Sequence, residues 1–420
     1  MKKLLIKNGT LIGNGWHCKS DILIEENLIT AIAEHLPENN AEVFDATDCI
    51  VSYGLADVHV HLREPGFSAK ETIETGTRAA AHGGFTTICA MPNLIPAPDS
   101  IETLFVEEQL INQQAVVEVR PYATITLERK GETVVDVEAL HSRVAGFSDD
   151  GNGIQSANIM KDAMWKVART DSIIAAHCEV KSLLRNGYIH KGKYAIRHGH
   201  QGICSKSEYA QIARDVKMAL KQGCRYHVCH ISTAESVDII RNAKRLSDKI
   251  SCETAPHYLT LSENELQEDG RFKMNPPLRS DNDRKALIEG IVDGTIEVIA
   301  TDHAPHTAEE KSRGLKDSAM GIVGLETAFA VCYTKLVKTG IINIEKLISL
   351  LCDNPRRIFG LGGALQVGER ADIAVFDVKR PYKINSRNFF SKGKSTPFEG
   401  WKVYGKCRLT VYNGEIVWKA

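Results

Sequence analysis

The chain is organised around the sequence GLADVHVHLREPG, which occupies residues 54–66. A largely apolar run that favours a β-strand ends in two histidines, His59 and His61, and Arg63 follows two residues later. Because alternate side chains of a strand share one face, a strand here points both imidazoles the same way. Imidazole is the commonest metal-binding side chain. This strand end therefore supplies half of a metal site, although a His-x-His pair alone is more often two ordinary histidines.

Length and composition indicate an ordinary globular protein. The 420 residues suffice for one large domain and one small domain. With 43% hydrophobic residues, 25% charged residues and a net charge of −1, nothing indicates a nucleic-acid or membrane partner. We find no apolar run of transmembrane length and no signal peptide. The 11 scattered cysteines are typical of reduced thiols, so we expect a cytoplasmic protein.

The two ends of the chain share a strand-rich pattern. Short strands are predicted at 4–7, 21–25 and 28–32, with turns at 8–9, 13–15 and 25–27. The same pattern returns at 371–376 and at 408–417, where Asn413-Gly414 is a hairpin turn signal. We therefore expect residues 1–52 and 364–420 to form one small, composite, β-sandwich-like domain.

Residues 54–363 alternate strand and helix signals. The strand candidates are 54–59, 85–91, 118–124, 144–148, 173–177, 225–230, 250–253 and 297–301. The helix candidates are 70–82, 100–112, 157–170, 206–222, 233–246, 281–292 and 324–339. This alternation predicts an α/β fold, a (β/α)8 TIM-like barrel. An open doubly wound sheet is the alternative, but no G-x-G-x-x-G turn follows the first strand.

Candidate metal ligands follow the predicted strands at the ends where a barrel places its active site. Besides the two histidines of the first strand, they are Asp149 or Asp150, His177, His230 and Asp302. Imidazole nitrogen and carboxylate oxygen suit zinc, and a set of this size suits two metals. Four neutral imidazoles leave two dications uncompensated, so one aspartate must bridge them. The spacing alone leaves open which of the adjacent aspartates does so.

Nine motifs carry a family resemblance across nearly the whole chain. They are HVHLREPG (59–66), KETIETG (70–76), AMPN (90–93), FSDDG (147–151), AHCE (176–179), HVCHIST (227–233), KMNPPLR (273–279), ATDHAPH (300–306) and GIVGLET (321–327). The set resembles the amidohydrolase superfamily and, more closely, its class I bacterial dihydroorotases. Three positions, Tyr53, Val180 and Met320, depart from the usual pattern of that family.

The resemblance implies a role for each matched residue. The implied ligands of two Zn²⁺ per subunit are His59 and His61 with Asp302 for the first metal, His177 and His230 for the second, and Asp150 as the bridge. Asp302 is also the implied general acid/base. The implied substrate contacts are Arg63, Asn93 and His306 on the carboxylate side, and Asn275 with the backbone of Met320 and Gly321 on the ring side. His61 is a further implied substrate contact.

The implied reaction is the reversible cyclisation of N-carbamoyl-L-aspartate to (S)-dihydroorotate and water, the third step of de novo pyrimidine biosynthesis. A metal-bridging hydroxide is the implied nucleophile. The substrate is a small molecule, and a homodimer and association with aspartate transcarbamoylase are further expectations. One alternative is a hydantoinase, dihydropyrimidinase or allantoinase, which needs a lysine that FSDDG lacks. Another is a non-catalytic scaffold of the same fold, which would have lost ligands that this chain keeps.

Two polar segments remain open from sequence alone. Residues 303–321 are long enough to form a mobile lid, with a solvated insertion as the alternative. Residues 188–202 are rich in Lys, Arg and His, and we interpret them as a solvated loop.

Overall fold

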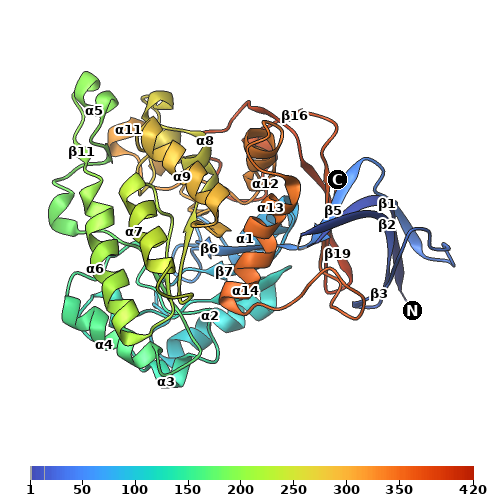
Figure 1. Cartoon of the computed structure of the whole chain (residues 1–420), viewed down its shortest axis with the longest axis horizontal. Coiled ribbons are helices and arrows are strands. Elements are labelled where there is room, and N and C mark those ends of the chain that lie inside the picture. Colours follow the sequence, from blue (N-terminus) through green and yellow to red (C-terminus); the bar gives the residue numbers. More distant parts are fainter. Residues whose placement is uncertain (1, 14) are drawn as a thin grey trace.

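Strands from both ends of the chain pair in one mixed sheet (Figure 1). The computed structural model describes residues 2–13 and 15–420, so Asn14 in the predicted 13–15 turn lies outside the described residues. The sheet order is β19-β18-β15-β5-β1-β2-β3, with β4 beside β1. The strands are β1 (Lys3–Gly13), β2 (Trp16–Glu25), β3 (Leu28–Ala33), β4 (Glu42–Asp45), β5 (Cys49–Tyr53), β15 (Ile373–Asp377), β18 (Lys406–Tyr412) and β19 (Glu415–Lys419).

The two ends of the chain meet where β5 runs antiparallel to β15. The predicted Asn413-Gly414 turn is confirmed: it joins β18 to β19, and both residues have positive φ, 51° and 79°. This combination is the one a tight hairpin turn requires. The chain is thus α/β with a β-rich region, while the composite domain of 1–52 and 364–420 stays a prediction.

The two larger sheets in the middle of the chain are parallel. One consists of β6 (Leu55–Val60), β7 (Phe85–Ala90) and β8 (Glu118–Pro121). The other has the order β14-β13-β12-β9, from β9 (Ile174–Ala176), β12 (Tyr226–Val228), β13 (Ile250–Thr254) and β14 (Val298–Ile299). Isolated parallel bridges connect their edges: Val60 with His303, and Phe147 with both Ala123 and Ile174.

The predicted strand at 144–148 is wrong as a regular strand, because only Phe147 of this segment bridges its neighbours. The segment is still extended, since Phe147 donates to Ile173 O and Ser148 to Ala123 O, both at 2.9 Å. Gly146 lies so close to Ile173 O that an added Cβ would be 2.7 Å from it. Because the two backbones approach each other this closely at Gly146, the segment pairs with its neighbour only over a short stretch.

Helices follow the parallel strands along the chain and pack outside them (Figure 1). The longer helices are α1 (Ile73–Gly83), α2 (Ile101–Gln114), α4 (Ala157–Val167), α6 (Lys206–Gln222), α7 (Ala234–Lys244) and α9 (Asp281–Asp293). Their N-termini are mostly capped by Ser or Thr side chains, as in Ser100 of α2 and Thr233 of α7. The short helices are α3 (Val137–Leu140), α5 (Lys193–His198), α8 (Pro256–Thr260), α10 (Ala308–Lys311), α11 (Gly314–Asp317), α12 (Ala328–Cys332), α13 (Ile344–Ile348) and α14 (Asn354–Phe359).

The prediction of a plain loop at 188–202 is wrong in part. The segment contains α5 between two short parallel strands, β10 (Ile189–His190) and β11 (Gly202–Ile203). Local contacts explain the order: the ring of Tyr194 stacks on His198 at 4.2 Å, and the Glu263 carboxylate accepts a hydrogen bond from Tyr194 N at 3.0 Å. These contacts stabilise a helix in a segment whose polar composition alone predicts a loop.

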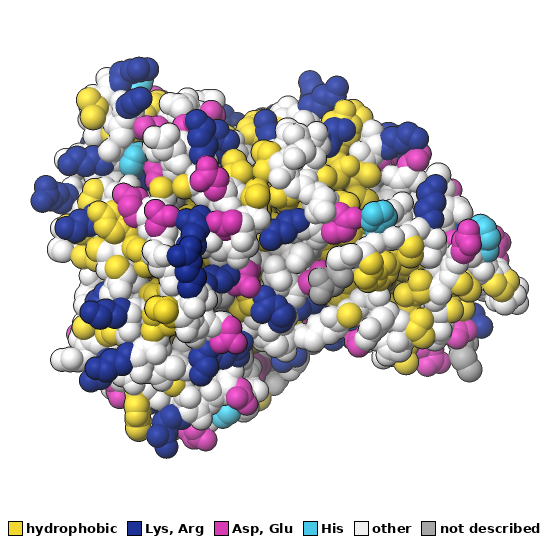
Figure 2. Space-filling view, in the orientation of Figure 1, with side chains coloured by type: hydrophobic (Ala, Val, Ile, Leu, Met, Phe, Trp, Pro, Cys, Tyr) yellow, Lys and Arg dark blue, Asp and Glu magenta, His cyan; other side chains and the backbone are white. Residues whose placement is uncertain are grey.

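Charged side chains of both signs are interspersed over the face that Figure 2 shows, as expected for a net charge of −1. Among the described residues, no helix combines the length and the apolar character that crossing a bilayer requires.

Arg356 of α14 is buried where the first parallel strands begin, with 4% of its surface exposed. Its guanidinium donates to Gly54 O at 2.9 Å and to the hydroxyls of Thr86 and Thr87 at 3.1 and 3.2 Å. It also stacks over the ring of Tyr53, 4.7 Å from the centroid. Tyr53 departs from the family pattern, and here its ring supplies one wall of the arginine site.

Arg356→Leu should lower the free energy of unfolding by about 2–3 kcal/mol, because several buried acceptors lose their donor. The adjacent Arg357 is the matched control, since it is exposed and pairs with Glu297 at the surface. Arg357→Leu should cost less than about 1 kcal/mol. Urea unfolding measures both, and equal losses would contradict the structural role of Arg356.

Candidate metal centre

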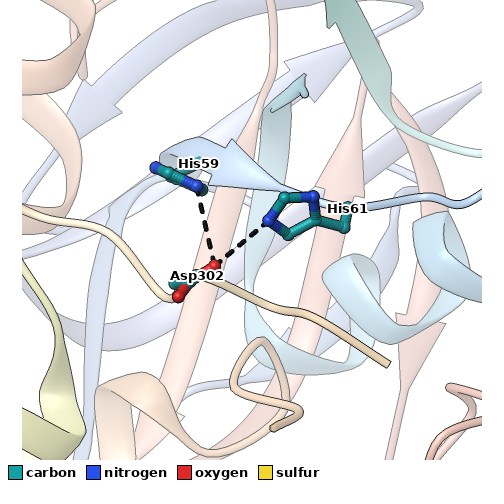
Figure 3. Close-up of side chains that lie close together, drawn as sticks. All are labelled: His59, His61 and Asp302. Carbon is teal, nitrogen blue, oxygen red and sulfur yellow. Dashed lines mark hydrogen bonds and ion pairs between the residues drawn. The ribbon is translucent and has the colours of Figure 1, made fainter. Parts of the chain in front are cut away.

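His59, His61 and Asp302 converge where β6 and β14 end (Figure 3). The two histidines lie on β6 and just beyond it, with 0% and 4% of their surfaces exposed. One carboxylate oxygen of Asp302 lies 3.6 Å from His59 Nε2 and 3.2 Å from His61 Nε2. The shared strand face predicted for the two imidazoles is therefore directed at one carboxylate.

Asp150 brings the other two histidines to the same place. Its Oδ1 lies 3.4 Å from His59 Nε2, 3.6 Å from His177 Nδ1 and 3.5 Å from His230 Nε2. Its Oδ2 lies 3.5 Å from His61 Nε2. One buried carboxylate thus lies among four imidazoles from three different strand ends.

The adjacent carboxylate, Asp149, is used differently. It accepts hydrogen bonds from Ile125 N at 2.8 Å, from Thr126 N at 3.1 Å and from the Thr126 hydroxyl. Asp149 thereby holds the loop after β8, while Asp150 faces the histidines. The spacing of the sequence left open which of the two adjacent aspartates faces the histidines. The structure shows that the Asp150 side chain does, whereas the Asp149 side chain points to the loop.

The centre has the donors of a metal site. Two groups of three residues each bring one ligand atom per residue within 4.8 Å of one another. The first group is His59, His61 and Asp302, and the second is His59, Asp150 and His230. Among the described residues, His59 Nε2 and Asp150 Oδ1 are buried without a hydrogen-bond partner. Buried polar atoms are costly unless they are satisfied, and nitrogen with carboxylate oxygen is the donor set of zinc. The residues therefore fit a bound metal ion.

Outer residues orient the histidines. Glu253 of β13 accepts from His59 Nδ1 at 2.7 Å and contacts His227 Nε2 at 3.0 Å. His61 Nδ1 lies 2.9 Å from Asn93 Oδ1, and His177 Nε2 lies 3.7 Å from a Glu179 oxygen. Such partners hold each ring so that its other nitrogen faces the ligand position.

The sequence reasoning missed Glu253. It stands in a strand pattern without any motif, and its partner His59 is 194 residues away. Its position at the end of the seventh strand candidate could have identified it, because a barrel gathers its functional residues at such strand ends.

Burial and histidine neighbours act in opposite directions on the carboxylates. Burial alone would raise the pKa of Asp150, yet the neighbouring His59 and His230 hold it well below its ordinary value. In the same way, the pKa of Asp302 is lowered by the hydrogen bond from His61 against the effect of burial. Both carboxylates are therefore anionic at neutral pH.

Arg63 lies beside this centre with its backbone at φ 63°. Its Nε donates to Pro305 O at 3.3 Å. In the described part of the chain, no carboxylate forms an ion pair with its guanidinium, and loss of solvent around it lowers the pKa of Arg63 to about 10. Asp302 and His230 also have positive φ, 48° and 32°. Strain of this kind clusters at functional sites.

The remaining predicted contacts surround the same region, but several are already engaged. His306 Nε2 donates to Met320 O at 2.8 Å, and burial together with Arg63 lowers the pKa of His306 to about 3. The Gly321 N–H donates to Lys273 O at 3.1 Å. Asn275 donates to Glu179 Oε1 at 3.0 Å, while its own Oδ1 is buried without a partner among the described residues.

Comparison with known proteins gives a consistent result. A family model described as dihydro-orotase-like matches residues 49–236. The chain is 48% identical to the dihydroorotase of Bacillus cytotoxicus over 419 residues, covering 99% of this chain and 98% of that protein. It is 49% identical to the dihydroorotase of Fusobacterium nucleatum over 417 residues, with the same coverage.

Solved structures of other cyclic amidases have the same fold. The L-hydantoinase (dihydropyrimidinase) of Arthrobacter aurescens superposes with a TM-score of 0.88 at 26% identity, covering 100% of this chain and 96% of that chain. The dihydropyrimidinase of Brevibacillus agri gives 0.86 at 22% identity, with coverage of 99% and 95%.

Asp150→Ala should abolish metal binding, with a loss of affinity beyond the roughly 10–100-fold typical of an outer residue. The matched control is Asp149→Asn, which should keep the metal because Asp149 only holds the loop after β8. Elemental analysis of both purified variants measures this. Full metal occupancy in Asp150→Ala would contradict the assignment.

Proposed function

This chain belongs to the dihydroorotase family, and from that premise we propose that its histidine–aspartate centre interconverts N-carbamoyl-L-aspartate and (S)-dihydroorotate in pyrimidine biosynthesis. The observation that carries this proposal is the guanidinium of Arg63, half-buried beside the centre and without a carboxylate partner among the described residues. A planar fork of donors suits a substrate carboxylate.

The proposed metal content is two Zn²⁺ per subunit. His59, His61 and Asp302 would hold one ion and His177 and His230 the other, with Asp150 between them. The distances from Asp150 to all four imidazoles support its position between the two ions. When bound, such a pair of ions lowers the pKa of water and polarises a carbonyl group.

The proton steps fall to Asp302. In the hydrolytic direction its carboxylate accepts the proton of the attacking water and delivers it to the leaving ring nitrogen. Ring closure runs through the same steps in reverse. Its contacts with His59 and His61 hold this carboxylate toward the reacting amide.

Arg63, Asn93 and His306 would bind the substrate carboxylate. Asn93 uses its oxygen on His61, so its NH₂ group remains for the substrate. Asn275 and the backbone at Met320-Gly321 would contact the ring. The hydrogen bond of His306 to Met320 O joins the two sides of the pocket, and His306 would release it to donate to the carboxylate.

The proposed architecture is a (β/α)8 barrel over residues 54–363 with a composite terminal domain. The bridges from Val60 to His303 and through Phe147 support closure, since they link both edges of the two parallel sheets. Cytoplasmic location, a homodimer and association with aspartate transcarbamoylase stay predictions.

The related amidases named above share the fold, but a hydantoinase-type activity has less support. Such an enzyme needs a lysine after the fourth strand segment, where this chain has Ser148-Asp149-Asp150-Gly151. Its substrates also lack the carboxylate that Arg63 would bind. A non-catalytic scaffold has less support still, because every expected ligand is present.

Arg63→Lys should lower kcat/KM for dihydroorotate roughly ten- to over a hundred-fold, because an ammonium cannot replace the bidentate fork. A charge-assisted contact contributes about 1.5–3 kcal/mol, which sets this range. Metal content should not change. Activity toward a cyclic imide without the carboxylate should barely change, since nothing there pairs with Arg63.

The measurement is kcat/KM on both substrates for the wild-type and variant proteins, each with zinc quantified. An equal loss on both substrates would make Arg63 structural. A wild-type protein active only on the neutral cyclic imide would favour the hydantoinase alternative.

A further inference from the structure

Lys311, the last residue of α10, buries its ammonium group with 7% of the residue exposed. Its Nζ donates to Ala319 O and Gly321 O, both at 2.7 Å, and to Lys273 O at 3.0 Å. An ammonium group has three N–H donors, so each is used on a different carbonyl. Burying a cation against carbonyls alone is costly. We therefore expect the buried Lys311 side chain to stabilise the segments whose carbonyls it binds.

The three carbonyls belong to two loops that lie far apart in the sequence. Lys273 precedes Asn275 by two residues, while Ala319 and Gly321 flank Met320. The loops also contact each other directly, because Gly321 N donates to Lys273 O at 3.1 Å. Lys311 thus binds both loops at the point where they meet.

The backbone at Gly321 needs such support. Its φ is 136°, a conformation that other residues rarely adopt, and an added Cβ would be 2.6 Å from Ala304 O. The carbonyl of Met320, one residue earlier, accepts the hydrogen bond from His306. A shift of this turn would therefore move a carboxylate-side residue as well as the ring side.

We infer that Lys311 is a positioning residue for the substrate pocket, which sets the separation of the 273–275 and 319–321 loops without touching the substrate. The inference rests on the proposed function, because that function assigns Asn275, Met320 and Gly321 to the ring. All three donors of Lys311 are used on backbone carbonyls, so none remains for a ligand. Lys311 thereby connects the middle of the segment that follows β14 to the loop at 273–275.

Lys311→Met should raise KM for dihydroorotate roughly ten- to a hundred-fold, because misplaced contacts weaken binding and orientation. Metal content should equal that of the wild type, and kcat should change much less than KM. Lys316→Met is the matched control, because this lysine is exposed on the same segment. Its backbone carbonyl, which the substitution keeps, accepts a hydrogen bond from Lys273 Nζ. The substitution should leave both constants unchanged.

A second readout does not depend on activity. Amide hydrogen exchange should become faster at 273–275 and 319–321 in Lys311→Met and should stay at the wild-type rate in the Lys316→Met control. Lys311→Gln, which keeps two N–H donors, should give an intermediate result in both assays. If Lys311→Met does not fold, the Gln variant decides.

An unchanged KM and unchanged exchange in an active, folded Lys311 variant would overturn the inference. So would a fall in kcat or metal content with KM unaltered. Failure of the proposed function is distinguishable, because the wild-type protein would then not turn over dihydroorotate at all. The exchange measurement would still test whether Lys311 orders the two loops.

Discussion

A single buried carboxylate faces four imidazole rings, and the surrounding structure keeps it there. Asp150 lies 3.4–3.6 Å from nitrogens of His59, His61, His177 and His230. In water these groups would separate, and in a protein interior their unpaired atoms are costly. The parallel strands bring the rings together from distant parts of the chain. A bound metal ion would offset the free-energy cost of burying these polar atoms without partners.

Orientation comes from a second layer of carboxylates and amides. Glu253 turns His59, and Asn93 turns His61, so that each presents Nε2 to the centre. Asp149 holds the loop after β8 by accepting three hydrogen bonds. Beyond the centre, Lys311 binds the carbonyls of the two loops on the ring side. The pocket is thus held by polar contacts whose partners are distant in the sequence.

Local patterns predicted much of this arrangement, and the failures have physical causes. The His-x-His strand and most helices follow from periodicity and caps, which neighbouring residues determine. Spacing could not separate Asp149 from Asp150, because the difference is the direction of each side chain. Glu253 was missed since its partner His59 lies 194 residues away, and Lys311 was missed since backbone carbonyls, which leave no residue pattern, are its partners. The segment around α5 has a solvated composition, and its structure depends on contacts such as those of Tyr194 with Glu263 and His198.

Crystals grown with zinc and measured at the zinc absorption edge test the central claim most directly. Two anomalous peaks about 3.5–4 Å apart should flank the Asp150 carboxylate, one beside His59 and His61 and the other beside His177 and His230. A single peak, or peaks that leave Asp150 without a metal contact, would contradict a two-metal centre bridged by this residue.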